Sequence, residues 1–486
     1  MPVPVISIAQ MREWEKASWA AGRKESEVID RVGRIVARRA ACLVQPGEII
    51  LILAGKGHNG DDARRAREHL SNWRVYLCEI NDPAADLSRL LPLLAQKPAL
   101  IIDGLFGIGL NRPLNEHWCG LIERVNEAST QVLAIDVPSG LNAETGQPEG
   151  AAIRATVTLT VGAAKHGLLL PSAWPYVGRL EVAPDIGLVP CPAESDIHWT
   201  VPGDFIGFPP IRSAFAHKGD FGRLAILAGS LGYHGASVLA ARGAQRAQPG
   251  LITLHTHEPV YQAVASQLQA VMVSVWQPIT RFSTEYNAIL IGPGLAAHNL
   301  PGEFKTATRN LWLRSPIPMI VDASALDWLP QEPLPDHPLR VITPHPGEAA
   351  RLLGSSAGEV EADRPRALRE ISRRLGDCWV VLKGQQTLIG RSTGPLRVNS
   401  SGNPHLAQGG SGDVLSGFLA GLLVQPRLQA DPLQTISYAV WQHGATADCL
   451  TAAQSNWVIE DLAREIGSVQ PTASCECPED LAQHPS

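Results

Sequence analysis

Short runs of apolar and β-branched residues recur along the chain and limit the folds that it can adopt. In the first half these runs are continuous, most of them end at a glycine or an aspartate, and helical patterns separate them. They cover residues 49–54, 75–80, 99–102, 132–135 and 157–161. Strands without polar alternation are buried on both faces, so the pattern predicts a parallel sheet between two layers of helices. Ligands bind where the strands of such sheets end, so the residues after each run are the functional candidates.

A proline-rich stretch at residues 184–210 has no sustained period and indicates a linker. A second series of runs follows it, and we therefore expect two domains, at residues 1–205 and 206–486. The second series covers residues 223–230, 251–255, 288–291, 319–322, 340–343 and 379–383. Both domains are expected to be α/β, the first as a Rossmann-like three-layer sandwich.

Composition and charge exclude several classes of protein. Hydrophobic residues make up 45% of the 486 residues and charged residues 18%, which excludes a disordered chain. The net charge of −6 gives no electrostatic argument for binding nucleic acid. The chain does not begin with a basic segment followed by an apolar one, as a signal peptide would, and its apolar stretches are far shorter than the roughly 18 residues that span a bilayer. We therefore expect a cytoplasmic protein that binds neither nucleic acid nor a membrane.

The first glycine-rich loop, residues 55–60, has the pattern G-x-G-x-x-G between a predicted strand and a predicted helix. With Glu79 19 residues further on, the loop alone would indicate a dinucleotide-binding site. Asp61 and Asp62 argue against this, because two carboxylates at the start of the helix would repel a pyrophosphate. The loop suits a cation or the hydrogen-bond donors of a ligand, and a tight turn with an acidic helix cap is the plain structural alternative.

Two further strand ends carry polar side chains. Residues 103–113 read D-G-L-F-G-I-G-L-N-R-P, and residues 136–140 read D-V-P-S-G. Together with the first loop, these strand ends present oxygen atoms from Asn59, Asp103, Asp136 and Ser139. Clusters of this kind suit hard cations and the polar edges of a ligand.

These segments, together with G-A-A-K-H-G-L-L-L at residues 162–170, resemble the NAD(P)H-hydrate epimerase family over roughly residues 10–190. The family pattern is G-x-G-N-N-G-G-D-G, then D-x-x-F-G-x-G-L-x-R-P, then D-x-P-S-G. The second and third parts are intact here. The first departs from the pattern at His58, Asp61 and Ala63, whereas Asn59, Gly60 and Asp62 are kept. These departures bear on the epimerase activity and not on the fold.

The resemblance implies roles for individual residues of this first half. A potassium ion would be held by Asn59, Asp103 and Ser139, and Asp136 would be the catalytic acid or base. The hydrated nicotinamide nucleotide would contact His58, Asn59, Gly60, Asp61, Asp62, Gly107, Ile108, Gly109, Leu110, Asn111, Arg112 and Pro113.

A second glycine-rich loop, N-P-H-L-A-Q-G-G-S-G-D at residues 403–413, leads into an apolar helix. Glycines at a helix start expose backbone N–H groups to an anion, and the helix dipole adds to the attraction. Asp413 in that place can take a proton from a substrate hydroxyl while the amides stabilise a transferring phosphoryl group. A glycine-rich turn with an acidic cap would explain the loop, but not the further segments at residues 292–294, 343–348 and 381–387.

Together with residues 217–222 and 235–236, these segments resemble the ribokinase-like fold and, within it, the ADP-dependent NAD(P)H-hydrate dehydratase family. The resemblance covers roughly residues 214–465. It implies that Asp413 is catalytic, and that Ala236, Gly294 and His345 contact the hydrate. The nucleotide would contact Lys383, Gly384, Gln385, Gln386, Thr387 and Gly412.

The two resemblances together predict an enzyme that repairs nicotinamide nucleotides. The first domain would interconvert the R and S hydrates NADHX and NADPHX, and the second would dehydrate the S form at the expense of ADP. ADP, Mg²⁺ and K⁺ are the expected cofactors, and a homo-oligomer is the expected state. The alternative is a ribokinase-like small-molecule kinase with a non-catalytic N-terminal ligand-binding domain. A Rossmann dehydrogenase is disfavoured by Asp61, Asp62 and the unmatched second half.

Overall fold

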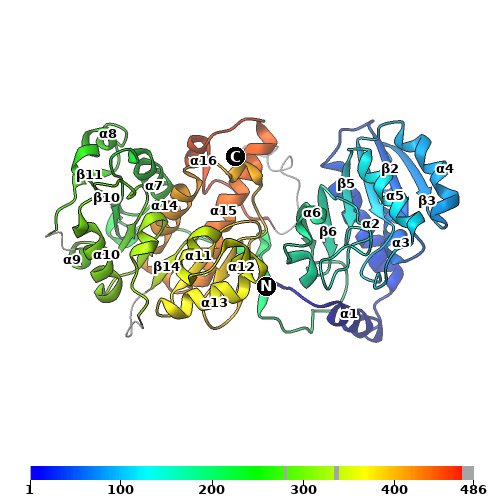
Figure 1. Cartoon of the computed structure of the whole chain (residues 1–486), viewed down its shortest axis with the longest axis horizontal. Coiled ribbons are helices and arrows are strands. Elements are labelled where there is room, and N and C mark those ends of the chain that lie inside the picture. Colours follow the sequence, from blue (N-terminus) through cyan, green and yellow to red (C-terminus); the bar gives the residue numbers. More distant parts are fainter. Residues whose placement is uncertain (1, 279–281, 333–338, 473–486) are drawn as a thin grey trace. The chain divides into compact units, whose positions relative to one another are not determined.

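The computed structural model describes residues 2–278, 282–332 and 339–472, and these residues divide into two compact units at residues 201 and 202 (Figure 1). The two units are described separately. Within the described ranges, no helix is both long enough and apolar enough to cross a membrane.

The first unit is built on a sheet with the strand order β3-β2-β4-β5-β6-β7. All neighbouring strands of this sheet are parallel. The strands are β2 (Ile49–Ala54), β3 (Arg74–Glu79), β4 (Leu100–Gly104), β5 (Gln131–Ile135), β6 (Val157–Val161) and β7 (Arg179–Ala183). Outside this sheet, β1 (Val3–Pro4) pairs with β8 (Ile197–Trp199) in the antiparallel sense. The predicted parallel sheet is therefore confirmed.

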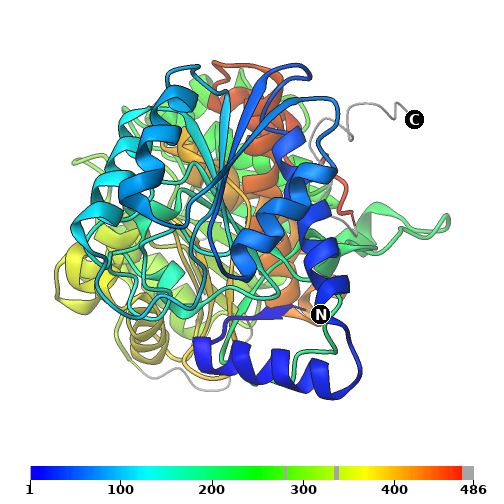
Figure 2. The ribbon, with the colours of Figure 1, turned by 90° about the vertical axis from the view of Figure 1, so that its right-hand side faces the viewer.

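Helices cover both faces of this sheet, as Figure 2 shows. The helices of the first unit are α1 (Ile8–Ala20), α2 (Glu25–Ala41), α3 (His58–Glu68), α4 (Pro83–Leu94), α5 (Glu116–Glu127) and α6 (Trp174–Val177). On one face, Leu51 and Ile101 share a hydrophobic core with Leu121 of α5. Ile50 and Ile52, which point to the other face, are also fully buried. This burial on both faces explains why the strands have no polar alternation.

The second unit has a larger sheet, in which its strands follow the order β17-β16-β15-β14-β13-β12-β9-β10-β11. The strands from β9 to β15 run parallel, and β16 and β17 add an antiparallel edge. The strands are β9 (Arg223–Leu227), β10 (Leu251–Thr256), β11 (Met272–Val275), β12 (Ala288–Ile291), β13 (Met319–Val321), β14 (Arg340–Ile342), β15 (Trp379–Leu382), β16 (Leu388–Gly390) and β17 (Leu396–Val398). The second α/β sheet is therefore also confirmed.

The helices of the second unit lie around this sheet (Figure 1). They are α7 (His234–Arg246), α8 (Tyr261–Ala265), α9 (Phe282–Glu285), α10 (Gly302–Arg314), α11 (Pro346–Leu353), α12 (Ala357–Ala362), α13 (Arg364–Arg374), α14 (Ser411–Leu423), α15 (Pro432–Ala453) and α16 (Ile459–Glu465). Residues of α7, α14, α15 and α16 form one core with Ile226, Leu290 and Val341 of the sheet. The expected second domain extends to residue 486, and residues 473–486 lie outside the described part.

Helices α7 and α14 pack with their backbones in contact. A Cβ atom added at Gly417 would lie 1.9 Å from the carbonyl oxygen of Ala240, and one added at Gly243 would lie 2.3 Å from that of Val414. A Cβ at Gly421 would similarly lie 2.6 Å from the carbonyl oxygen of Ala244. Gly417 meets Ala240, and Gly421, four residues further along α14, meets Ala244, four residues further along α7. The two helices therefore run parallel. The N-termini of α7 and α14 therefore lie at the same end of the helix pair.

Candidate active sites

The first glycine loop turns sharply from β2 into α3, which begins at His58 after the N-cap residue Gly57. A Cβ atom at Gly60 would lie 2.0 Å from the carbonyl oxygen of Gly55, so no larger residue fits there without a shift. A Cβ at Gly55 would lie 2.2 Å from the carbonyl oxygen of Leu105. The glycines of the motif therefore serve the tight packing of this turn against the segment after β4.

Asn59 connects three strand ends through its side chain. Its Nδ2 donates to the carbonyl oxygens of Phe106, at 2.8 Å, and of Ile135, at 3.0 Å. The Asn59 side chain is buried, and Gly107 lies against it, since a Cβ at Gly107 would be 3.5 Å from Oδ1. Of the other predicted substrate contacts, residues 108–113 continue this loop and become exposed toward Pro113.

Asp103 and Ser139 are in direct contact at the ends of β4 and β5. The Ser139 hydroxyl donates to Asp103 Oδ1 at 2.6 Å, and its backbone N–H donates to Oδ2 at 2.8 Å. Burial raises the pKa of Asp103 to about 6, while the hydrogen bonds from Ser139 and Leu105 act in the opposite direction. The Ser139 hydroxyl also lies 3.3 Å from the Phe106 carbonyl oxygen, to which Asn59 donates.

The three predicted potassium ligands thus converge around one backbone carbonyl. They offer carboxylate, hydroxyl and amide oxygen atoms, which hard cations prefer. The Asp103 carboxylate is fully buried, and within the described ranges no cationic side chain is paired with it. A buried carboxylate is favourable only when it is protonated or compensated, so these residues fit a bound cation.

Asp136 follows β5 and is held by Lys165, a lysine outside the predicted site residues. It has a positive φ of 61° and is buried. Its Oδ1 accepts from Lys165 Nζ, from Thr160 Oγ1 at 3.0 Å and from the Val161 N–H at 3.2 Å. Lys165 is fully buried and also donates to the Val161 carbonyl at 2.9 Å. Asp136 and Lys165 therefore form a buried, hydrogen-bonded ion pair.

Other carboxyl groups surround this pair. Burial, followed by the nearby charges of Asp136 and Asp61, raises the pKa of Asp62 well above its usual value. Burial and Asp136 also raise the pKa of Glu15 on α1, although Lys165 opposes this. Glu15 has no motif around it and lies far from the other site residues in the sequence, so no sequence pattern points to it. His58 Nε2 lies 3.0 Å from Glu25 Oε1 on α2.

In the second unit, Asp413 lies in the first turn of α14, after Gly410, which has a φ of 98° and serves as N-cap. Burial raises the pKa of Asp413 to about 7, the carboxylates of Asp322 and Glu348 add to this, and Lys383 opposes it. A carboxyl group with a pKa near neutrality can both accept and release a proton under ordinary conditions. Asp413 therefore has the electrostatic properties of a general base.

Lys383, the first residue of the predicted nucleotide loop, lies close to two carboxylates. Its Nζ lies 3.0 Å from Asp322 Oδ1 and 3.9 Å from Glu348 Oε2. A Cβ at Gly412 would lie 3.3 Å from the same Nζ. Burial alone would lower the pKa of Lys383, but these carboxylates reverse the effect and raise it. Asp322 was not among the predicted residues, although it ends a run in the same way as Asp103 and Asp136.

His345 caps α11. Its Nδ1 accepts from the backbone N–H groups of Gly347, at 3.0 Å, and Glu348, at 3.3 Å. Glu348 in turn accepts from the His345 N–H at 2.8 Å. Because Nδ1 accepts hydrogen bonds, the proton of the neutral ring lies on Nε2. The half-exposed ring thus caps the helix through Nδ1, and its Nε2 lies 3.5 Å from Glu348 Oε1.

The predicted hydrate contacts Ala236 and Gly294 lie side by side. Gly294 has a φ of 67°, and a Cβ there would lie 3.1 Å from that of Ala236 and 2.3 Å from the carbonyl oxygen of Tyr233. The Ser230 hydroxyl donates to the Gly294 carbonyl at 2.6 Å. These contacts hold the end of β12 against the start of α7.

The predicted nucleotide loop, residues 383–387, follows β15, and Arg364 holds the backbone where the loop begins. This buried arginine donates from Nη2 to the carbonyl oxygen of Leu382 at 3.0 Å. Gly384 has a φ of 129°, and a Cβ there would lie 2.8 Å from Arg364 Nη1. Within the loop, the Thr387 hydroxyl donates to the Gly384 carbonyl at 3.0 Å. Arg364 begins α13, outside every recognised motif, so sequence patterns did not indicate it.

Comparisons with known proteins cover both units. A family model described as NAD(P)H-hydrate dehydratase matches residues 224–471, and one described as YjeF-related protein N-terminus matches residues 67–167. The chain is 32% identical over 464 residues to the bifunctional NAD(P)H-hydrate repair enzyme Nnr of Coxiella burnetii, with 90% of this chain and 93% of that protein covered. It is 35% identical over 365 residues to the protein of the same name from Escherichia coli, with 73% and 67% covered.

Solved structures also match parts of this chain. A ribokinase-like superfamily protein from Enterococcus faecalis aligns with a TM-score of 0.50 and 24% identity, over 57% of this chain and 96% of that one. This similarity shows the fold. An ADP/ATP-dependent NAD(P)H-hydrate dehydratase from Bacillus subtilis, co-crystallised with ATP and Mg²⁺, is 32% identical, with a TM-score of 0.48 over 53% of this chain and 92% of that one.

Proposed function

Because this chain belongs to the family of bifunctional NAD(P)H-hydrate repair enzymes, we propose that its two units carry out two consecutive steps. The first unit interconverts the R and S hydrates of NADH and NADPH, and the second dehydrates the S form with ADP. The family has an isomerase and a lyase activity, and relatives that cover both units favour this function over a small-molecule kinase. The functional domains proposed for these steps are residues 1–205 and 206–486.

The observation that carries the dehydratase proposal is the position of Asp413 beside Lys383 at the start of α14. Asp413 takes the proton of the substrate hydroxyl as its oxygen attacks the terminal phosphorus of ADP. The bond between that phosphorus and the bridging oxygen breaks, and AMP leaves. The C–O bond then breaks as the ring-nitrogen lone pair forms an iminium, phosphate leaves, and loss of a proton from the adjacent carbon restores the reduced ring.

The residues around Asp413 complete this proposed site. Lys383 and the N–H groups at the start of α14 balance the negative charge of the transferring group. Mg²⁺ in nucleotide sites is held by phosphates and one or two carboxylates, and it neutralises charge on the transferring phosphoryl group. Asp322 and Glu348, which both lie near Lys383, are the carboxylates proposed to hold it.

In the first unit, the Asp136–Lys165 pair is the proposed acid and base. Inversion at the carbon beside the ring nitrogen requires the hydroxyl to leave as water and water to return on the other face. The pair supplies the proton for departure and takes it back on return. A potassium ion held by Asn59, Asp103 and Ser139 would balance the charge of the dinucleotide beside these carboxylates.

The test of this function uses the separate epimers of the hydrate. Purified protein is incubated with the S hydrate, ADP and Mg²⁺, and the absorbance of the reduced nicotinamide is followed. We expect recovery that depends on ADP, and the same recovery from the R hydrate through the first unit. No recovery from the S form would refute the dehydratase. Potassium-free buffer should slow conversion of the R form and leave that of the S form unchanged.

We further propose that the enzyme works in the cytoplasm as a homo-oligomer. Both statements rest on the sequence-based expectations given above. Sedimentation equilibrium of the purified chain tests the second, and a mass equal to that of one chain would refute it.

A further inference from the structure

The segment that follows the first glycine loop carries a charge where the epimerase family pattern has none. Asp61 stands in place of a glycine, within the loop proposed to contact the hydrate. The hydrate is a dinucleotide with an anionic pyrophosphate, so a free carboxylate in this loop would repel it. The inference below rests on the proposed function of the first unit.

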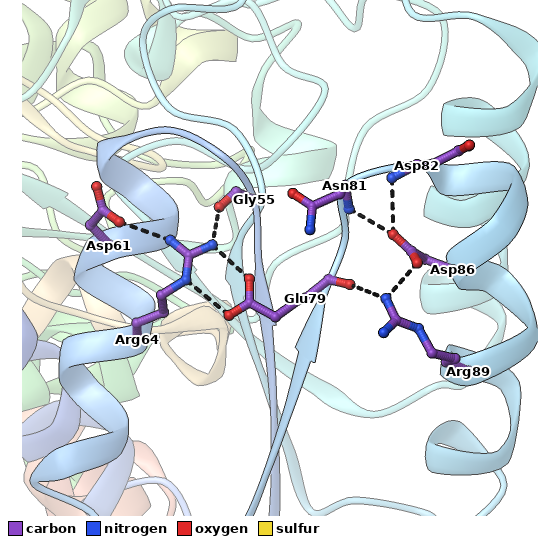
Figure 3. A network of polar contacts seen from close by, with 8 residues as sticks. All are labelled: Gly55, Asp61, Arg64, Glu79, Asn81, Asp82, Asp86 and Arg89. Atoms are coloured by element: carbon purple, nitrogen blue, oxygen red, sulfur yellow. Dashed lines mark hydrogen bonds and ion pairs between the residues drawn. The ribbon is translucent and has the colours of Figure 1, made fainter.

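Asp61 is paired with Arg64, one turn further along α3 (Figure 3). Arg64 Nη1 donates to Asp61 Oδ1 at 2.8 Å, and Nη2 donates to the Gly55 carbonyl at 2.7 Å. Two parallel bonds join the guanidinium to Glu79, from Nε to Oε1 at 3.0 Å and from Nη2 to Oε2 at 2.7 Å. Arg64 therefore connects both ends of the loop to the end of β3.

The partner Glu79 is itself held in place. Arg89 on α4 donates to its backbone carbonyl at 2.9 Å and is paired with Asp86 (Figure 3). Asp86 in turn accepts from the N–H groups of Asn81, at 2.6 Å, and Asp82, at 2.9 Å. The end of β3 is thus fixed by α4, and Glu79 offers Arg64 a fixed bidentate partner.

We propose that Arg64 is a positioning residue of the epimerase site, which orients Asp61 and compensates its charge so that the altered loop still accepts an anionic dinucleotide. Glu79 then has a role different from that of the acidic residue in a dinucleotide fingerprint. In a dinucleotide fingerprint the acidic residue accepts a hydrogen bond from a ribose hydroxyl. In this chain both carboxylate oxygens of Glu79 instead accept hydrogen bonds from Arg64.

The exposure of these side chains decides which measurement is informative. Those of Arg64, Asp61 and Glu79 are 31%, 46% and 37% exposed. Ion pairs this exposed contribute little to folding stability, so the loss of Arg64 should leave the unit folded. The charge of Asp61 still acts on a bound anion, and salt weakens that effect. The expected consequence is a higher KM that falls toward normal at high ionic strength.

The test measures epimerisation alone, by omitting ADP so that the dehydratase is idle. Purified S hydrate is incubated with the full chain, and the appearance of the R form is followed by chromatography. The variants are Arg64→Gln, Asp61→Asn and the double variant. Arg67→Gln, an exposed position on the same helix, is the control for loss of one positive charge. Dehydration of the S hydrate with ADP is measured on each sample as an internal reference.

We expect Arg64→Gln to raise KM about tenfold with kcat within twofold of wild type. The double variant should have a lower KM than Arg64→Gln, because position 61 no longer carries a carboxylate, and Arg67→Gln should change neither constant. Arg64→Lys keeps the charge and should raise KM by less than Arg64→Gln. An unchanged KM in Arg64→Gln, or an increase that persists in the double variant, would overturn the inference. A wild-type chain without epimerase activity would instead refute the proposed function, and the inference with it.

Discussion

The two units both place a lysine beside candidate catalytic carboxyl groups, but they pair it differently. In the first unit, Lys165 is bonded to Asp136 itself. In the second unit, Lys383 is bonded to Asp322, and the pKa of Asp413 rises to about 7. An ion pair keeps a carboxylate charged, whereas burial near other carboxylates favours its protonated form. The comparison shows that Lys165 is bonded directly to the proposed acid–base carboxylate, whereas Lys383 is bonded to a neighbour of the proposed base, whose pKa burial raises.

The largest expected effect is that of Asp413→Asn in the second unit. The amide cannot take the proton of the hydroxyl, so turnover of the S hydrate should fall roughly 10³-fold, within the range of general-base effects. Binding of ADP, measured by calorimetry, should remain, because Lys383 keeps its bond to Asp322. Epimerisation measured without ADP is the control and should be normal. Turnover near the wild-type rate would show that Asp413 is not the base.

Asp136→Asn in the first unit should reduce epimerisation roughly 10²-fold and also reduce stability. Asparagine tolerates the positive φ at this position, so the substitution isolates the loss of charge. It leaves Lys165 buried without its anion, which costs about 3–5 kcal/mol. Urea denaturation should therefore show a large loss for Asp136→Asn and a much smaller one for Asp413→Asn. Equal losses of unfolding free energy in the two variants would contradict the statement that Lys165 is bonded to Asp136 whereas Lys383 is not bonded to Asp413.

The pH dependence of dehydration tests the role of Asp322. The base must be ionised, so kcat/KM should fall as the pH is lowered through about 7, the pKa of Asp413. The negative charge of Asp322 raises the pKa of Asp413, and the positive charge of Lys383 lowers it. Asp322→Asn removes the first of these charges and frees Lys383 from its ion pair, so both changes should lower the pKa of Asp413. The acid limb should therefore move to lower pH, by about one unit. A limb that stays in place, or moves to higher pH, would contradict this account of Asp413.

The smallest expected effects are changes in unfolding free energy when glycine is replaced by alanine. One replacement is at a tightly packed position and the other at an open one. Gly417→Ala forces α7 and α14 apart and should cost about 1–3 kcal/mol of unfolding free energy. Gly120 lies within α5 with nothing near its missing side chain. Gly120→Ala should stabilise the first unit by about 0.5–1 kcal/mol. Thermal unfolding of both variants measures the difference, and a stabilising Gly417→Ala would show that the helices can separate freely.

Much of the fold follows from the sequence because the buried parallel strands leave a direct signal. β7 was not recognised, since its residues 179–183 lie at the sheet edge and alternate in burial, unlike the continuous runs. Asp322 was predictable by the same strand-end rule that identified Asp103 and Asp136. Arg364 was not, because it acts from the start of a distant helix.

The residues around the altered glycine loop also show which contacts a sequence pattern does not predict. The sequence identified Asp61 as a departure from the family pattern, but not the residue that compensates for it. Arg64 is one of several arginines in that helix. Its spacing of three residues from Asp61 is a local signal, but its contact with Glu79 on the neighbouring strand is not. Pairings between elements depend on the register of a helix and a strand, which local patterns do not contain.

The most direct test of the proposed two-step repair is the conversion of pure R hydrate. Wild-type protein with ADP and Mg²⁺ should convert it completely to reduced nucleotide, much faster than the hydrate epimerises spontaneously. Asp136→Asn should slow this conversion to near the spontaneous rate while S hydrate is still consumed normally. If the wild-type protein converts R hydrate no faster than spontaneous epimerisation allows, the first unit is not an epimerase and the account is wrong.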